Sequence, residues 1–247
     1  MAEASKPTIV SAFDSAAIAD AAALIWKGQP VAVPTETVYG LAADAGNGQA
    51  VARIFAAKGR PRFNPLIAHV PGIAEADRHA ILPPAARILI EAFWPGPLTI
   101  VAPRRPDSPV CDLACAGLNT IALRVPAHEV ARALLAQVDF PLAAPSANRS
   151  ERLSTTTAEA AEEEVGVSAA LVLDGGACAL GLESTIIGFG DTAILLRPGA
   201  IPAEAIEALI AQTKEFERAV AVLELRAITF EGSDSLDNPT KALEGKK

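Results

Sequence analysis

The sequence from residue 31 reads Val31-Ala32-Val33-Pro34-Thr35-Glu36-Thr37-Val38-Tyr39-Gly40. Its first three residues are apolar and rich in β-branched side chains, which predicts a short buried strand. Pro34 to Thr37 then predicts a polar turn at the end of that strand. Two hydroxyls, a carboxylate and a glycine there offer acceptors for an ammonium group and donors for a carboxylate. Taken alone, an ordinary turn explains these residues equally well.

The periodicity of hydrophobic residues predicts further helices and strands on both sides of this segment. Helices are predicted at residues 48–57, 84–93, 127–138 and 157–164, from Asp14 or Ser15 to Lys27, and from Pro202 to about Gln212. Further strands are predicted at residues 65–70, 98–102, 120–125, 142–144, 171–173, 185–188 and 193–196. Because strands also occur as adjacent pairs, the fold expected is α/β, with an open, twisted, mixed sheet and flanking helices.

The chain divides into three parts by composition. Residues 1–212 are expected to form one folded domain, and residues 213–231 an additional strand or edge element. Residues 232–247 contain only two large apolar side chains, Leu236 and Leu243, so a flexible tail is expected there.

Composition narrows the class of protein. The 247 residues carry a net charge of −8 and only 4% aromatic residues, which argues against a strong nucleic-acid surface. No apolar run is long enough to span a membrane, and the N-terminus lacks the apolar segment of a signal peptide. Three cysteines do not form a disulfide framework, so a cytoplasmic location is expected.

Several familiar motifs are absent or misleading. The sequence contains no P-loop, and Gly188-Phe189-Gly190-Asp191 has strand-like flanks, which predicts a hairpin turn and not a dinucleotide site. Cys111 and Cys115 are too far apart for a zinc knuckle, and the three histidines have no nucleophile elbow as a partner. No metal ligand is therefore expected among the protein side chains.

A cationic segment interrupts the acidic chain. No acidic residue lies between Asp44 and Glu75. The same stretch contains four basic residues, namely Arg53, Lys58, Arg60 and Arg62. Such a segment is expected to attract a small anion. Lys58 to Pro65 follows the end of a predicted helix, where complementarity to the helix dipole is the simpler explanation. Three cations in five residues exceed what a helix end needs, which favours a triphosphate site.

Two later segments offer further anion-binding groups. Ser146 and Asn148 follow a predicted strand, and the Ser/Thr cluster at residues 154–157 predicts a helix N-terminus, which also favours phosphate. Glu183-Ser184-Thr185 and Arg197-Pro198-Gly199 lie at strand ends. An arginine there is more often part of a surface ion pair than of a ligand site.

Together these segments resemble the YrdC-type threonylcarbamoyl-AMP synthase family, from about Ala17 to Ile210. The matching segments are residues 33–41, 58–61, 64–66, 94–99, 144–148, 183–186 and 196–199. The resemblance implies an α/β fold with a concave, positively charged cleft. It also implies a nucleotidyltransferase that converts L-threonine, bicarbonate or CO₂ and ATP into threonylcarbamoyl-AMP and pyrophosphate.

The resemblance further implies which residues bind the substrates. Threonine would be bound by Thr35, His69, Arg124, Ala144 and Ser184. ATP would be bound by Lys58, Arg60, Asn64, Thr120, Ser146, Ser154 and Arg197, and Asn148 would contact either ligand. Mg²⁺ would arrive with ATP. Downstream threonylcarbamoyl-transfer proteins would use the product to modify adenosine 37 of tRNA, with weak or no direct tRNA binding by this chain and no membrane contact.

Three alternatives remain at this stage. The first is an RNA-binding module, which the net charge disfavours. The second is a carbamoyl transferase similar to hydrogenase maturation proteins, whose zinc-finger and acylphosphatase-like segments do not occur in this sequence. The third is an inactive relative, which the presence of Arg60, Ser146 and Arg197 disfavours. Larger family members also carry a linker with a His-Tyr-Ala-Pro signature that closes over the nucleotide, and this signature does not occur in the 247 residues.

Overall fold

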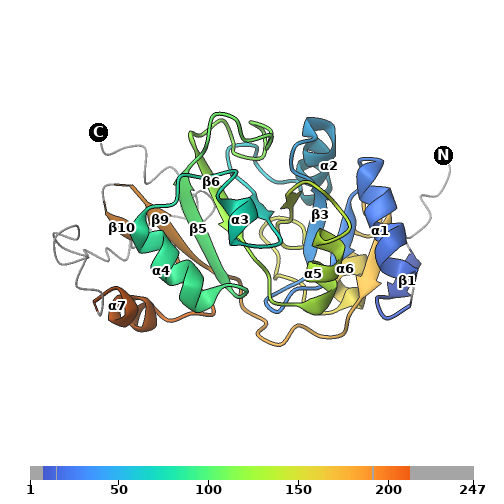
Figure 1. The fold of residues 1–247 in the computed structure, drawn as a ribbon. Helices are drawn as coiled ribbons and strands as arrows, with labels where there is room; N and C mark the ends of the chain where they lie inside the picture. Colours follow the sequence, from blue (N-terminus) through green and yellow to red (C-terminus); the bar gives the residue numbers. More distant parts are fainter. Residues whose placement is uncertain (1–7, 15, 191, 212–247) are drawn as a thin grey trace.

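The computed structural model describes residues 8–14, 16–190 and 192–211. Helices are interspersed among the strands along this part of the chain, and several strands follow one another directly (Figure 1). The strands are β1 (Thr8–Ser11), β2 (Val31–Val33), β3 (Gly40–Asp44), β4 (Ile67–His69), β5 (Leu98–Pro103), β6 (Thr120–Arg124), β7 (Leu142–Ala143), β8 (Leu171–Asp174), β9 (Thr185–Phe189) and β10 (Ala193–Arg197). The helices are α1 (Ala17–Trp26), α2 (Gly48–Lys58), α3 (Ile73–Ala76), α4 (Pro84–Phe93), α5 (Glu129–Leu135), α6 (Ala158–Val165) and α7 (Ala203–Ala211).

The strands form one mixed sheet, as the sequence predicts. Its ten strands run in the order β1-β8-β2-β3-β7-β4-β6-β5-β9-β10, so that β1 and β10 lie at opposite ends (Figure 1). The sheet contains parallel pairs, such as β4 with β6 and β5 with β9, and antiparallel pairs, such as β2 with β3 and β5 with β6. The predicted hairpin is confirmed, since β9 and β10 pair antiparallel.

In the sheet, the neighbouring strands β1, β8, β2 and β3 are covered by helices on both faces. Successive side chains of a strand point to opposite faces, so Val31 and Val33 pack in the cluster that contains α1 and α5. Ala32 and Leu41 pack on the other side, in the cluster that contains α2 and α6. These strands are therefore buried on both sides.

The other half of the sheet is covered differently. Leu98 and Ile100 of β5 belong to the same large cluster as Ala32 and Leu41, which also contains α4 and α7. On the opposite face, Val101, Ala122 and Ile186 form a small cluster whose members, among the described residues, all come from strands. These three side chains also line a cavity. The cleft thus opens on the face of the sheet opposite α4 and α7.

Three predicted boundaries differ from the structure. Helix α1 begins at Ala17 without a side-chain cap, later than Asp14, although Gly28 ends it in the left-handed region with a φ of 72° as expected. Helix α5 spans Glu129–Leu135 and is shorter than residues 127–138, because His128 accepts a hydrogen bond from the Val130 amide and acts as its N-cap. Strand β4 is likewise shorter than residues 65–70.

Strands β1 and β3 and the short helix α3 were not predicted from the sequence. Strand β3 reads Gly-Leu-Ala-Ala-Asp, which has no β-branched residue and begins with glycine, so its composition does not favour a strand. Its pairing with β2 and β7 stabilises it instead. The predictions for residues 213–231 and 232–247 lie outside the described residues.

Within the residues that the structure describes, no helix is long and apolar enough to cross a membrane.

Candidate functional site

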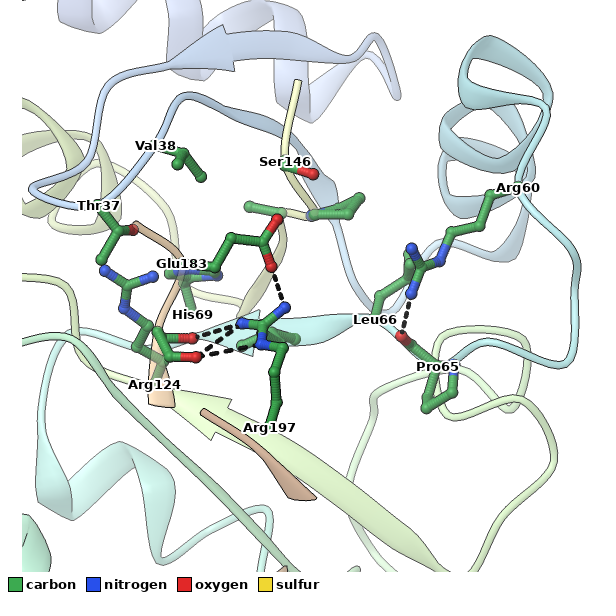
Figure 2. Close-up of a pocket in the computed structure, with 14 residues that line it drawn as sticks. Thr37, Val38, Arg60, Pro65, Leu66, His69, Arg124, Ser146, Glu183 and Arg197 are labelled. Atoms are coloured by element: carbon green, nitrogen blue, oxygen red, sulfur yellow. Dashed lines mark hydrogen bonds and ion pairs between the residues drawn. The ribbon is translucent and has the colours of Figure 1, made fainter. Parts of the chain in front are cut away.

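Two adjoining cavities lie at the ends of the central strands. The smaller compartment has a volume of about 80 Å³, and the larger compartment has a volume of about 300 Å³. Both compartments are lined by Arg60, Pro65, Ile67, Ser146, Glu183 and Arg197. They therefore share a wall, so that a molecule in one compartment would lie directly beside a molecule in the other. Figure 2 shows residues that line the smaller compartment.

The structure brings most of the predicted site residues to these compartments. His69, Arg124, Ala144 and Ser184, which were predicted for threonine, line the smaller compartment. Lys58, Arg60, Asn64, Ser146, Ser154 and Arg197, which were predicted for ATP, line the larger compartment together with Asn148. Segments that are far apart in the sequence thus meet in the grouping that the resemblance implies.

Thr35 and Thr120 do not line either compartment. The Thr35 hydroxyl lies within its own turn, where Oγ1 donates to the Val38 carbonyl at 2.6 Å and accepts from the Thr37 and Val38 amides, both at 3.2 Å. The residue of this turn that lines the smaller compartment is Thr37. In the structure, Thr35 therefore fixes the turn that presents Thr37.

The turn at residues 34–39 is bound to the loop at residues 144–148. The Leu41 amide donates to the Pro145 carbonyl at 2.8 Å, and the Ala147 amide donates to the Tyr39 carbonyl at 2.7 Å. The Tyr39 hydroxyl is buried and donates to the Gly176 carbonyl at 2.8 Å. These bonds hold one wall of the cleft in place.

Lys58 stabilises the same loop from the end of α2. Its Nζ donates to the Ser146 carbonyl at 2.5 Å and also to the Asn148 carbonyl. Burial, together with the neighbouring charge of Arg60, lowers the pKa of Lys58 to about 8. Near neutral pH the ammonium group remains charged and is positioned between the two carbonyls, at the edge of the larger compartment.

Arg124 is held by a carboxylate that does not line the compartments. Its Nη2 lies 2.5 Å from Oε1 of Glu36, and its Nε donates to the Gly96 carbonyl at 3.2 Å. The other Glu36 oxygen, Oε2, accepts from the Ala127 and His128 amides at 2.9 and 3.3 Å. Burial alone would raise the pKa of Glu36, but Arg124 and these bonds lower it below its ordinary value. The pair is therefore ionised, and the guanidinium has a fixed orientation.

His69 lies next to Arg124 because β4 and β6 run parallel and the two residues pair in register. Burial and the charge of Arg124 lower the pKa of His69 to about 3, so the imidazole is neutral at physiological pH. Its Nδ1 is buried and has no hydrogen-bond partner within the described residues. His69 lines the smaller compartment, and a neutral imidazole there suits a hydroxyl or another uncharged polar group.

Arg197 is oriented by the chain segment around Ser184. Its Nη2 donates to the Ser184 carbonyl and hydroxyl at 2.9 and 3.0 Å, and its Nη1 donates to Glu183 Oε2. The backbone at Gly199 lies close to the backbone of residues 183–185. Only glycine fits there, since a Cβ at residue 199 would lie 2.4 Å from the Glu183 carbonyl oxygen. The residue at the end of β10 therefore reaches both compartments.

Two asparagines of the larger compartment carry unsatisfied polar atoms. Asn64 is 1% exposed, and neither Nδ2 nor Oδ1 has a partner in the described part of the chain. The Oδ1 atom of Asn148 is also without a partner there. Buried polar atoms of this kind are uncommon and suit a polar ligand. A similar atom occurs at Thr120 Oγ1, although that residue does not line the compartment.

Sequence reasoning did not assign Glu36, Thr37 or Glu183 to the site. All three lie within segments that the sequence singled out, namely residues 34–40 and 181–185. Their positions depend on contacts with residues distant in the chain, such as Arg124 and Arg197. Spacing within a motif does not reveal such pairings.

The chain is similar to several known proteins. A family model named Sua5/YciO/YrdC, with the description "Telomere recombination", matches residues 23–199. The threonylcarbamoyl-AMP synthase of Bacillus subtilis is 46% identical over 195 residues, which cover 78% of this chain and 56% of that protein. A putative threonylcarbamoyl-AMP synthase of Mycobacterium tuberculosis is 40% identical over 199 residues, with 78% of this chain and 88% of that protein covered.

A solved structure shows the same arrangement of the chain. It is that of Pyrococcus abyssi Sua5 complexed with L-threonine, which superposes with a TM-score of 0.75 at 45% identity. The match covers 78% of this chain and 57% of the other. The chain thus spans about half the length of the first curated relatives that it matches.

The ion pair between Glu36 and Arg124 leads to a prediction about stability. Replacing the carboxylate in Glu36→Gln leaves the buried guanidinium without its counter-charge, which is expected to lower the free energy of unfolding by about 3 kcal/mol at pH 7. Because the pKa of Glu36 is lowered on folding, its contribution is complete above its ordinary pKa of 4.5 and is lost as the pH falls through the folded-state value. In urea denaturation, the free energies of unfolding of the wild type and of Glu36→Gln should become equal at low pH.

Asp112→Asn provides the control for this measurement. Asp112 also pairs with an arginine, Arg104, but its side chain is 87% exposed. Loss of this ion pair in Asp112→Asn is expected to change the free energy of unfolding by less than about 0.5 kcal/mol. Equal effects of the two substitutions would show that the Glu36 pair does not stabilise the cleft.

Proposed function

Because this chain belongs to the Sua5/YciO/YrdC family, we propose that it is an enzyme that makes threonylcarbamoyl-AMP and pyrophosphate from L-threonine, bicarbonate or CO₂, and ATP. The observation that carries this proposal is the pair of adjoining compartments with Arg60, Ser146 and Arg197 in the shared wall. A reaction between an amino acid and a nucleotide needs two such neighbouring sites. The names of the relatives support the same reaction.

We assign threonine to the smaller compartment. Arg124 suits the carboxylate, because a guanidinium can grip it through two hydrogen bonds. His69, Ser184 and the Ala144 backbone supply uncharged polar groups nearby, and Thr35 acts through the turn that it fixes. The volume of about 80 Å³ suits a small amino acid better than a nucleotide.

ATP is assigned to the larger compartment, where it enters as its Mg²⁺ complex. Lys58, Arg60 and Arg197 supply positive charge for the phosphates, and Asn64, Ser146, Ser154 and Asn148 supply neutral polar groups. Val101, Ala122 and Ile186 give part of this compartment an apolar floor that suits a base or sugar.

The proposed chemistry depends on placement more than on an acid–base pair. The threonine ammonium group first releases one proton to solvent. The free amine then attacks the carbon of CO₂ and releases a second proton to solvent, which gives a carbamate. A carbamate oxygen then attacks the α-phosphorus, and the bond to the bridging oxygen breaks to release pyrophosphate. Fixed cations beside the phosphates stabilise the charge that develops on the leaving group.

The product would serve the modification of adenosine 37 in tRNA. Separate transfer proteins would take up the threonylcarbamoyl group, and this chain would contact tRNA weakly or not at all. We place the reaction in the cytoplasm, in keeping with the free thiols of Cys111, Cys115 and Cys178.

Pyrophosphate release tests this proposal. With ATP and bicarbonate present, release should depend on L-threonine, and Arg60→Ala should lower turnover by about 100-fold, as loss of an electrostatic contact to the reacting phosphates typically does. Arg62→Ala is the matched control, since Arg62 is exposed in the same loop and lines neither compartment.

Threonine-independent release would contradict the proposal, as would equal effects of the two arginine substitutions. Binding of tRNA without ATP, with a steep dependence on salt, would favour the RNA-binding alternative.

Amino-acid selectivity gives a further prediction. A compartment that hydrogen-bonds the threonine hydroxyl should discriminate strongly against valine, which would leave polar partners such as His69 Nδ1 unsatisfied. Discrimination against serine, which lacks only a methyl group, should be about 1–3 kcal/mol. The measurement is kcat/KM for adenylate formation with each amino acid. Equal use of valine would rule out threonine as the substrate and leave the ATP assignment intact.

A further inference from the structure

The carboxylate of Glu183 stands at the boundary between the two compartments. It lines both of them, and its side chain is 32% exposed. Figure 2 shows Glu183 near the middle of the pocket, with Arg124 and Thr37 to one side and Arg60 to the other. None of the roles assigned above uses this carboxylate.

The protein contacts of Glu183 keep it ionised and leave it able to bind a ligand. Ser154 Oγ donates to Oε1 at 2.8 Å, and Arg197 Nη1 donates to Oε2. Burial alone would raise the pKa of Glu183, but Arg197, Ser154 and the charges of Lys58 and Arg60 lower it. A carboxylate can accept about four hydrogen bonds, so each oxygen can accept another hydrogen bond beyond these contacts.

A carboxylate at this place would suit the Mg²⁺ that enters with ATP, but it does not suit the phosphates themselves. It repels them and offsets part of the attraction of Lys58, Arg60 and Arg197. Glu183 also lines the smaller compartment, so the hydrogen bonds that it can still accept are available to the other substrate.

The smaller compartment needs one negative charge to match an amino acid. An amino acid is a zwitterion, and charge complementarity calls for a cation at its carboxylate and an anion at its ammonium group. Arg124 supplies the cation, and His69 is neutral. Among the described residues that line this compartment, Glu183 is the one that carries a carboxylate.

We propose that Glu183 binds the amino group of the amino-acid substrate and holds its nitrogen at the boundary with the nucleotide compartment. This assignment rests on the proposed function and makes Glu183 a substrate-binding and specificity-determining residue. With the carboxylate on Arg124 and the nitrogen on Glu183, the substrate is fixed at two charged points. A carbamate formed on that nitrogen then lies beside the phosphates.

Calorimetric binding to the full chain tests the assignment with two ligands. L-threonine and 3-hydroxybutanoate share the carboxylate and the hydroxyl, but 3-hydroxybutanoate lacks the amino group. The wild-type protein should bind L-threonine at least about 10-fold more tightly, as expected for a hydrogen bond between charged groups. Glu183→Gln, which is nearly the same size, should remove most of this preference.

The affinity for ATP separates this role from a general loss of structure. Glu183→Gln removes a negative charge near the phosphates and keeps one oxygen that can accept from Arg197 or Ser154, so its affinity for ATP should fall by much less than its affinity for L-threonine. Glu151→Gln is the matched control, because Glu151 is exposed and lines the larger compartment but not the smaller one. It should leave the preference for L-threonine unchanged.

Each outcome has a distinct meaning. If Glu183→Gln keeps the full preference for L-threonine, or loses affinity for ATP and threonine equally, the assignment is overturned. If the Gln variant does not unfold cooperatively, Glu183→Ala, which also removes the carboxylate, replaces it, and an undiminished preference for L-threonine in that variant also overturns the assignment. If the wild-type protein does not bind L-threonine at all, the proposed function is overturned, and the assignment of Glu183 is overturned with it.

Discussion

The cleft depends on cations that the protein holds in place through its own oxygen atoms. Arg124 is fixed by Glu36 and the Gly96 carbonyl, Lys58 by two carbonyls of the loop at residues 146–148, and Arg197 by the chain segment at Ser184. Each group has its orientation before a substrate binds. Such preorganisation is effective in stabilising developing charge, because no reorganisation is needed during the reaction.

The mixed sheet explains why these groups meet. Strands β4 and β6 run parallel and both end at the cleft, which places His69 beside Arg124. Residues 144–148 follow β7, which lies next to β4, and Glu183 and Ser184 precede β9. Helices α4 and α7 cover the opposite face of this half of the sheet, so that the remaining face stays open as the floor of the larger compartment.

Much of this arrangement could be predicted from local patterns, and the rest depends on long-range contacts. Periodicity predicted the mixed sheet, and the motifs at residues 58–65 and 144–148 predicted groups that do line the larger compartment. Strand β3 was missed because its small residues form a strand only through pairing with β2 and β7. Thr35 was assigned to the substrate, yet its hydroxyl lies within its own turn, while Glu36 pairs with an arginine 88 residues away.

The central claim is that the two compartments separate an amino acid from a nucleotide across one shared wall. The most direct measurement is a crystal structure of this protein with L-threonine and a non-hydrolysable ATP analogue. We expect the threonine carboxylate on Arg124, its amino group on Glu183, and the phosphates beside Arg60 and Arg197 in the larger compartment. Phosphates bound at Arg124 in the smaller compartment, or threonine bound away from both compartments, would contradict the account.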